Sequence, residues 1–377
     1  MAICAVASGN ALYLWDLNTK QLLRMIQASN SKPIMTVSFL PNSTTLIYST
    51  PYSVSKINLE PVYDANNDTR LNIVPLITRG GSIEKISSVE FSKCPGSQGM
   101  LYYGCGAKIW RRHVYTGTLT RELTHTAPAL SKMGNITQIL AASTSSLLFT
   151  RHRESSKILV WSDNKAKCKT LDPGVVGIAS CFCLHPDSHH LIVGSEDGGL
   201  SRVNIQSGIV RGHYPPLQTK QDKHSSISRA VGKFGKMMSS TPKFLNQNAP
   251  KGSPVVGLMV SPLGDYLVSV TRSGYIAKWD VYNGRLMSAQ LVSAKGIQRC
   301  SKFESNANIV TRVAHSPNGT IMAMVTAYHN IYVVDVSHMG LIRKIGSNLV
   351  SSCGVTGLLI SYDGRTLYAS HMDGSGK

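Results

Sequence analysis

Two thiols and an imidazole are the first candidates for chemistry in this sequence. Cys181, Cys183 and His185 occupy alternate positions of one expected strand, so their side chains point to the same side. Thiolates and imidazoles bind zinc, but a structural zinc site needs four ligands, usually arranged in closely spaced pairs. The turn HPDS that begins at His185 stands where the turn SPNG, residues 316–319, stands in another repeat. We therefore interpret the group as two core thiols and a turn histidine, and we predict no metal site.

A cluster of cationic side chains is the second candidate. Residues 213–253 contain seven Lys or Arg residues against the single acid Asp222. Four apolar residues within this stretch recur at helical spacing and share one face of a helical wheel: Ile227, Val231, Phe234 and Met238. Such a segment can order on binding, with its apolar stripe in a partner groove and its basic face on phosphate.

We therefore predict that residues 213–253 form a basic insertion loop, part-helical or disordered, that binds RNA or a protein partner. The candidate binding residues are Lys220, Lys223, Arg229, Lys233, Phe234, Lys236, Lys243 and Lys251. Two other interpretations of the same pattern stay open. One is a solvated loop with accidental periodicity, and the other is a helix lying on a membrane surface.

The elements that must position these residues repeat along the chain. Trp15-Asp16 closes the run LYLWDL, and Trp279-Asp280 closes YIAKWDV. Degenerate copies end at Trp110, Trp161, Asn204 and Asp335. Each copy ends an alternating apolar strand and is followed by a short polar turn and one more strand. Recurrence at roughly 40 to 55 residues with this pattern is typical of the blades of a WD-repeat β-propeller.

The blade pattern can be followed over most of the sequence. Its clearest copy is 253–291, in which four short strands are separated by Gly-containing turns such as Asn283-Gly284. Similar units are 175–212 and 308–345, and looser ones are 34–60, 82–123 and 135–171. We predict an all-β fold, a single WD-repeat β-propeller over residues 1–377 with about seven four-stranded blades.

Three stretches depart from the regular blade. Residues 60–81 indicate a long inter-strand connection, and residues 2–26 supply three strands without an inner one. Residues 354–377 indicate a partial blade. Two arrangements remain open: the chain stops mid-blade, or a C-terminal strand completes the N-terminal blade and closes the ring, which removes exposed strand edges.

The overall composition indicates which kinds of partner the protein favours and which kinds of catalytic site its sequence lacks. Lys and Arg outnumber Asp and Glu by 39 to 20, which gives a net charge of +19 and favours polyanions, nucleic acid before an anionic membrane. The eight cysteines are scattered, as in a protein of a reducing compartment. The sequence contains no apolar run of membrane-spanning length, no signal-peptide pattern, and no P-loop, GxSxG, HExxH or dinucleotide-binding fingerprint. We predict no enzyme and no cofactor.

One blade carries a more specific pattern. The stretch 191–212 ends in a run whose matching residues are Asn204, Gln206, Ser207, Gly208, Arg211 and Gly212. With the flanking stretches 158–171, 330–345 and 361–375, it resembles the tandem WD-repeat subunits of the small-subunit processome. Members of that family are longer, have two propellers and end in a helical domain that has no counterpart here.

The resemblance implies a non-catalytic scaffold in ribosome biogenesis, located in the nucleus and nucleolus. Its expected partners are other WD-repeat subunits, pre-ribosomal RNA and U-three small nucleolar RNA, with no membrane and no small-molecule substrate. Two alternatives remain: a cytoplasmic WD-repeat adaptor for vesicle traffic, cytoskeleton or ubiquitin ligases, and a propeller enzyme, because fold alone does not decide function.

Overall fold

The structure is a computed structural model, and it describes most of the chain between residues 3 and 371. The gaps in this description are 29–30, 41–42, 61–72, 79–83, 93, 95–96, 98, 124–132, 163–166, 217–251, 294–295, 300–308, 347–353 and 362. Nearly all of the regular structure in the described residues is β-strand. Within the described part of the chain, no helix is long and apolar enough to cross a membrane.

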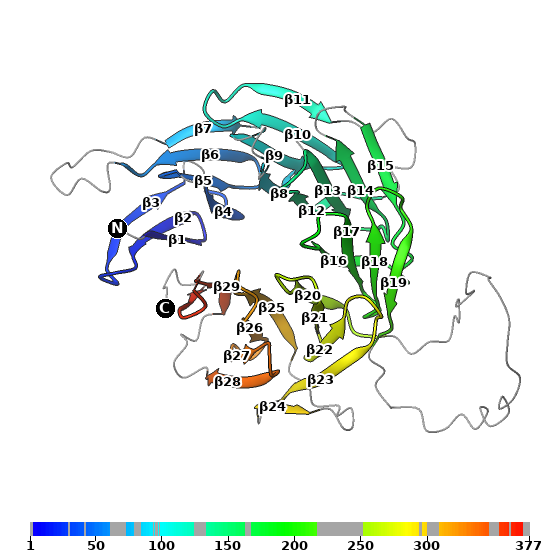
Figure 1. The fold of residues 1–377 in the computed structure, drawn as a ribbon. Coiled ribbons are helices and arrows are strands. Elements are labelled where there is room, and N and C mark those ends of the chain that lie inside the picture. Colours follow the sequence, from blue (N-terminus) through cyan, green and yellow to red (C-terminus); the bar gives the residue numbers. More distant parts are fainter. Residues whose placement is uncertain are drawn as a thin grey trace, which may run out of the picture.

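Antiparallel sheets follow one another along the chain and curl into a ring (Figure 1). The first sheet has three strands, β1 (Ile3–Ser8), β2 (Ala11–Asp16) and β3 (Leu22–Gln27). The second comprises β4 (Thr36–Phe39), β5 (Thr45–Ser49), β6 (Ser53–Asn58) and β7 (Ile73–Thr78). The third comprises β8 (Ile86–Phe91), β9 (Met100–Cys105), β10 (Lys108–His113) and β11 (Leu119–Leu123).

The middle of the ring continues the same order. One sheet comprises β12 (Ile136–Ala141), β13 (Leu147–His152), β14 (Ile158–Ser162) and β15 (Lys167–Leu171). The next comprises β16 (Ala179–Leu184), β17 (His190–Ser195), β18 (Leu200–Asn204) and β19 (Val210–Tyr214).

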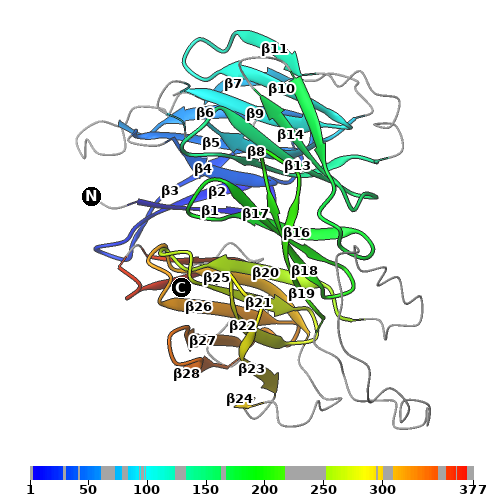
Figure 2. The same ribbon diagram turned by 45° about the vertical axis from the view of Figure 1, so that its right-hand side comes forward.

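Three further sheets complete the described chain. The first comprises β20 (Val255–Val260), β21 (Tyr266–Thr271), β22 (Tyr275–Asp280), β23 (Leu286–Ser293) and a fifth strand, β24 (Gly296–Arg299). The second comprises β25 (Val310–His315), β26 (Ile321–Thr326), β27 (Ile331–Asp335) and β28 (Gly340–Ile345). The last has only β29 (Val355–Ile360) and β30 (Leu367–His371). The turned view in Figure 2 shows the same succession of sheets.

The prediction of an all-β propeller is confirmed. Six sheets carry four or five strands, and the three-stranded β1–β3 and two-stranded β29–β30 stand at the remaining position of a ring of about seven blades. β1 and β30 contact each other. In the described residues β29 pairs with β30, and the two terminal sheets are separate.

The apolar core lies between neighbouring blades, which explains the strand sequences. The second strand of each complete blade is largely covered on both faces, so strands such as β9, β21 and β26 are mostly apolar in sequence. Between two of the blades, for example, Met259 and Val268 pack with Met322 and Tyr332. Inner strands approach closely where glycine stands. A Cβ built on Gly257 would lie 2.8 Å from Cβ of Val313 on the next inner strand.

The prediction of a connection over the whole of 60–81 needs a correction. Residues 73–78 form β7, the outer strand that completes the second blade by pairing with β6. The sequence pattern did not predict β7 because it contains Pro75, and proline has no N–H to donate to a neighbouring strand. It is tolerated here because β7 is an edge strand, and the register shifts at the Ser55–Pro75 pair.

Candidate functional site

The predicted basic binding residues lie outside the described residues. This applies to Lys220, Lys223, Arg229, Lys233, Phe234, Lys236, Lys243 and Lys251, which all fall within 217–251. The described ends of that stretch leave β19 after Tyr214 and enter β20 at Val255, two neighbouring blades of the ring. The prediction that these residues bind RNA or a protein therefore remains a prediction.

The six motif residues lie on one hairpin, β18–β19. The Oδ1 atom of Asn204 accepts hydrogen bonds from the backbone N–H and the hydroxyl of Ser207, at 2.8 and 3.0 Å. Gly208 has φ +74° and donates its N–H to the carbonyl of Asn204 at 2.9 Å. Arg211 and Gly212 follow on β19, where Gly212 pairs with Arg202. The polar atoms of Asn204 and Ser207 thus stabilise the turn.

The same turn recurs after the Trp-Asp strands. Oδ1 of Asp16 accepts the N–H of Asn18 at 2.8 Å, and Oδ1 of Asp280 accepts the N–H of Tyr282 at 2.9 Å. The pKa of both carboxyl groups is lowered by such hydrogen bonds, from the N–H of Asn18 to Asp16 and from the N–H groups of Asn283 and Tyr282 to Asp280. The asparagine of the motif is therefore a neutral version of a feature that the fold uses several times.

Lysine side chains of one blade donate hydrogen bonds to backbone carbonyls in the corresponding turn of the next blade. Lys56 Nζ donates to the carbonyls of Val114 and Tyr115 at 3.2 and 3.1 Å. Lys278 Nζ donates to the carbonyls of Val336 and Ser337 at 3.3 and 3.1 Å. The two contacts are equivalent, each bridging one blade to the turn of the next.

A third lysine makes the corresponding bridge beside a groove. Lys169 Nζ donates to the carbonyl of Gln206, a motif residue, at 2.6 Å. Next to this bond a cavity of about 820 Å³ opens between the blades β12–β15 and β16–β19. Leu147, Val160 and Ile205 give it an apolar floor. Its polar lining comes from Thr144, Ser145, Ser162, Cys168, Lys169, Asp187, Ser188, His189 and Gln206.

The groove has the composition of a binding site for a peptide or a side chain of a partner. Ligand sites of roughly 300 to 1,000 Å³ combine an apolar surface with a few fixed polar groups. The Lys169–Gln206 bond holds one wall of the groove to the other. Sequence reasoning missed this groove, because its lining comes from two blades and only their packing brings it together.

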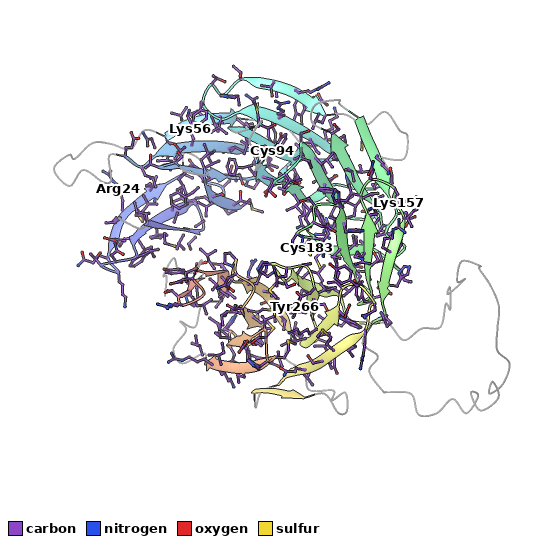
Figure 3. The ribbon with its side chains drawn as sticks, in the orientation of Figure 1. Arg24, Lys56, Cys94, Lys157, Cys183 and Tyr266 are labelled. Carbon is purple, nitrogen blue, oxygen red and sulfur yellow. The ribbon has the colours of Figure 1, made fainter. Side chains whose placement is uncertain are left out.

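The two strand thiols are partly buried in the wall of the ring. Cys181 and Cys183 pack against the core between β16 and β20, and Cys183 lies on the inner part of the ring wall (Figure 3). Burial raises the pKa of Cys181 to about 12 and raises that of Cys183 as well. Since the thiolate is the reactive form, both groups are poor nucleophiles and poor metal ligands.

Comparison with known proteins gives the fold and no closer relationship. No family model and no curated protein matches the sequence. The computationally designed Ika8 protein is similar in structure, with a TM-score of 0.67 and 16% identity over 100% of this chain and 92% of that chain. A chain in the crystal structure of the mitotic checkpoint complex is similar with a TM-score of 0.58 and 16% identity, over 90% and 84% of the two chains.

At 16% identity these likenesses carry the fold alone. The chain has a β-propeller fold consistent with a WD-repeat protein. Such a propeller is typically a scaffold and is compatible with a role in binding other proteins.

Proposed function

We propose that this protein is a non-catalytic scaffold of ribosome biogenesis that binds pre-ribosomal RNA and U-three small nucleolar RNA in the nucleolus. In this role it would resemble U three protein twenty-one and would assemble with other WD-repeat subunits of the small-subunit processome. The observation that carries the proposal is the combination of a propeller with a net charge of +19. A rigid ring offers many edges to partners, and a basic surface attracts a polyanion.

The distribution of charge in the described residues supports this proposal. Many carboxylates are held by hydrogen bonds within their own turns. Asp335, for instance, accepts the N–H of Ser337 at 2.8 Å, and although burial opposes it, its hydrogen bonds from Ser337 and His338 lower its pKa to about 2. Several cations, among them Lys20, Lys32 and Arg365, are exposed. An approaching polyanion therefore meets cations more readily than acids.

The test is crosslinking of the protein to RNA in cells, followed by sequencing of the bound RNA. We expect enrichment of small-subunit precursor RNA and U-three RNA. Changing Lys233, Lys236 and Lys243 to Glu weakens this binding without changing thermal stability. The matched control changes Lys32, Lys85 and Arg365 to Glu, which alters the net charge equally at exposed sites of the described surface.

The control separates a local binding segment from a general charge effect. Equal losses in both triple variants would show binding by net charge alone, without a role for the insertion. Recovery of only unrelated RNA, or of none, would overturn the proposal. For the purified protein the RNA affinity falls steeply with salt, because phosphate contacts release counterions.

A second candidate function is favoured by the groove between β12–β15 and β16–β19. A cavity of about 820 Å³ with an apolar floor suits a peptide of a protein partner. This fits the cytoplasmic adaptor for vesicle traffic, cytoskeleton or ubiquitin ligases. Recovery of such proteins by a wild-type bait, lost when Ile205 is changed to Glu and independent of nuclease treatment, would favour the adaptor over the RNA scaffold.

A further inference from the structure

Two histidines and an aspartate meet in the turn that joins β16 to β17. His185 Nδ1 lies 3.1 Å from Asp187 Oδ1, and His190 Nδ1 lies 2.6 Å from Asp187 Oδ2. One ligand atom from each of the three residues lies within 4.8 Å of the others. We propose that this turn is a binding site for a divalent transition-metal ion, with Zn²⁺ as the preferred ion.

Comparison with the equivalent turns shows that the histidines are exceptions to the repeat. Ser261, Ser316 and Ser361 begin the same turn in three other sheets, and each closes it with the same backbone hydrogen bond from the residue three positions later. In each of those turns the serine hydroxyl donates to a side-chain oxygen, as Ser316 does to Asn318 Oδ1 at 2.6 Å. His185 occupies the serine position, and His190 occupies the position of Tyr266 and Ile321.

Where the other turns have a serine hydroxyl that donates a hydrogen bond, this turn has His185, and its Nδ1 atom has no hydrogen to donate to Asp187. His185 Nε2 lies 3.0 Å from the carbonyl oxygen of Gly264, which can only accept, so Nε2 carries the hydrogen. In the neutral ring Nδ1 then carries a lone pair, and that lone pair faces the carboxylate oxygen of Asp187 at 3.1 Å. The N–H of Asp187 donates a hydrogen bond to the same nitrogen at 3.2 Å, and the N–H groups of His189 and His190 donate to Asp187 Oδ1 at 2.7 and 3.1 Å. A cation bound between the ring nitrogen and the carboxylate would stabilise two acceptors that lie this close together.

The bond to Gly264 is also the kind of support that metal-binding histidines have. Such a histidine usually donates its second ring N–H to a backbone carbonyl or a carboxylate, which fixes the ring and its tautomer. His185 is only 4% exposed, and a Cβ built on Gly264 would lie 2.6 Å from its Cε1 atom. The imidazole is therefore held between two blades in the orientation that presents Nδ1 to Asp187.

The donor set and the access match a zinc ion. Zinc accepts imidazole nitrogen and carboxylate oxygen at about 2.0 to 2.2 Å in a tetrahedron. Asp187 and His190 have 33% and 21% of their side-chain surfaces exposed, so an ion can reach the site from solvent. Water takes the fourth position. On binding, the proton that His190 Nδ1 shares with Asp187 leaves to solvent and the metal takes its place.

The site is tested by titrating the purified full chain with Zn²⁺ against a chromophoric chelator, with Mg²⁺ as the comparison ion. We expect one Zn²⁺ per wild-type chain, and an affinity that falls by about tenfold or more in His185→Ser and in His190→Ala. His185→Ser restores the serine of three other turns and so retains the fold, which circular dichroism checks. Zn²⁺ raises the melting temperature of the wild type and not of His185→Ser.

His213→Ala is the matched control, because this histidine is exposed on β19 and lies outside both the cluster and the groove. It keeps wild-type Zn²⁺ affinity. The proposal is overturned by equal zinc stoichiometry and affinity in the wild type, His185→Ser and His190→Ala, or by the absence of zinc binding in the wild type.

Discussion

Trp279 and Trp15 close the same Trp-Asp strand in two sheets, β22 and β2, but only Trp279 is fixed by a hydrogen bond. Its indole N–H donates to Ser269 Oγ at 3.0 Å, and the ring is 3% exposed. Trp161 does the same with Thr150 Oγ1 at 2.9 Å. In the described residues the indole N–H of Trp15 has no hydrogen-bond partner.

Strand register explains the difference. Trp279 pairs with Leu267, and the acceptor Ser269 lies two residues further along β21. Trp15 pairs with Cys4, so the corresponding position on β1 is Val6, which has no hydroxyl. The dipeptide therefore marks the third strand of a blade, whereas the hydrogen bond that fixes the tryptophan depends on a separate residue on the neighbouring strand.

The largest expected effect comes from removing the two indoles. Trp279→Ala destabilises the protein by about 3–5 kcal/mol, because it empties a buried site against Tyr214, whose ring lies 5.9 Å away. Trp15→Ala costs less, since Trp15 is only partly buried. Chemical denaturation followed by circular dichroism measures both, and equal losses would show that the two sheets support the ring equally.

The acceptor hydroxyl gives the next effect in size. Ser269→Ala leaves the buried N–H of Trp279 without its partner and costs about 1–3 kcal/mol. Thr150→Val is the matched test in the blade that contains Trp161, and we expect a loss of similar size. Unfolding free energies from denaturant titration decide the matter. A change below a few tenths of a kcal/mol in both variants would show that the hydrogen bond is immaterial.

Much of this architecture could be predicted from the sequence, because strand alternation and turn residues are local signals. The blades around Trp161 and Trp279 follow directly from them. Pro75 concealed β7, and the short fifth strand β24 gave no signal beyond its pairing with β23. These two strands depend on the edges of their sheets, which a local pattern does not describe.

The candidate site was less accessible to sequence reasoning. Strand alternation predicted that His185 would lie on the same side as Cys181 and Cys183. The chain instead turns at Pro186, so that His185 contacts Asp187 of its own turn and the carbonyl of Gly264 in the next blade. Aligning the repeated turns was the signal that could have found it, since histidine stands there in place of serine. The predicted basic binding residues remain untested by the described structure.

A hydroxyl introduced at position 6 would give Trp15 the hydrogen-bond acceptor that Trp279 already has. Val6→Thr has nearly the same shape and places an oxygen where Trp15 can donate to it. Because a satisfied buried hydrogen bond contributes about 0.5–1.5 kcal/mol, we expect a gain of that order. Val6→Ala serves as the control for lost volume. A loss of stability in Val6→Thr as large as in Val6→Ala would show that Trp15 cannot reach this position.

The aspartates of the two dipeptides should behave alike, and their effect is the smallest. Backbone N–H groups lower the pKa of Asp16 and of Asp280 below the ordinary value of 3.8. A carboxyl whose pKa is lowered in the folded state stabilises that state above its unfolded pKa, and the contribution is lost as the pH falls through the folded pKa. Asp16→Asn and Asp280→Asn should keep the turn, as Asn204 does, and lose this acid dependence. Melting temperatures between pH 7 and about pH 2 test this expectation, since both substitutions flatten the acid limb by similar small amounts. If only Asp280→Asn flattened it, the two sheets would differ in their turns as well as in their tryptophans.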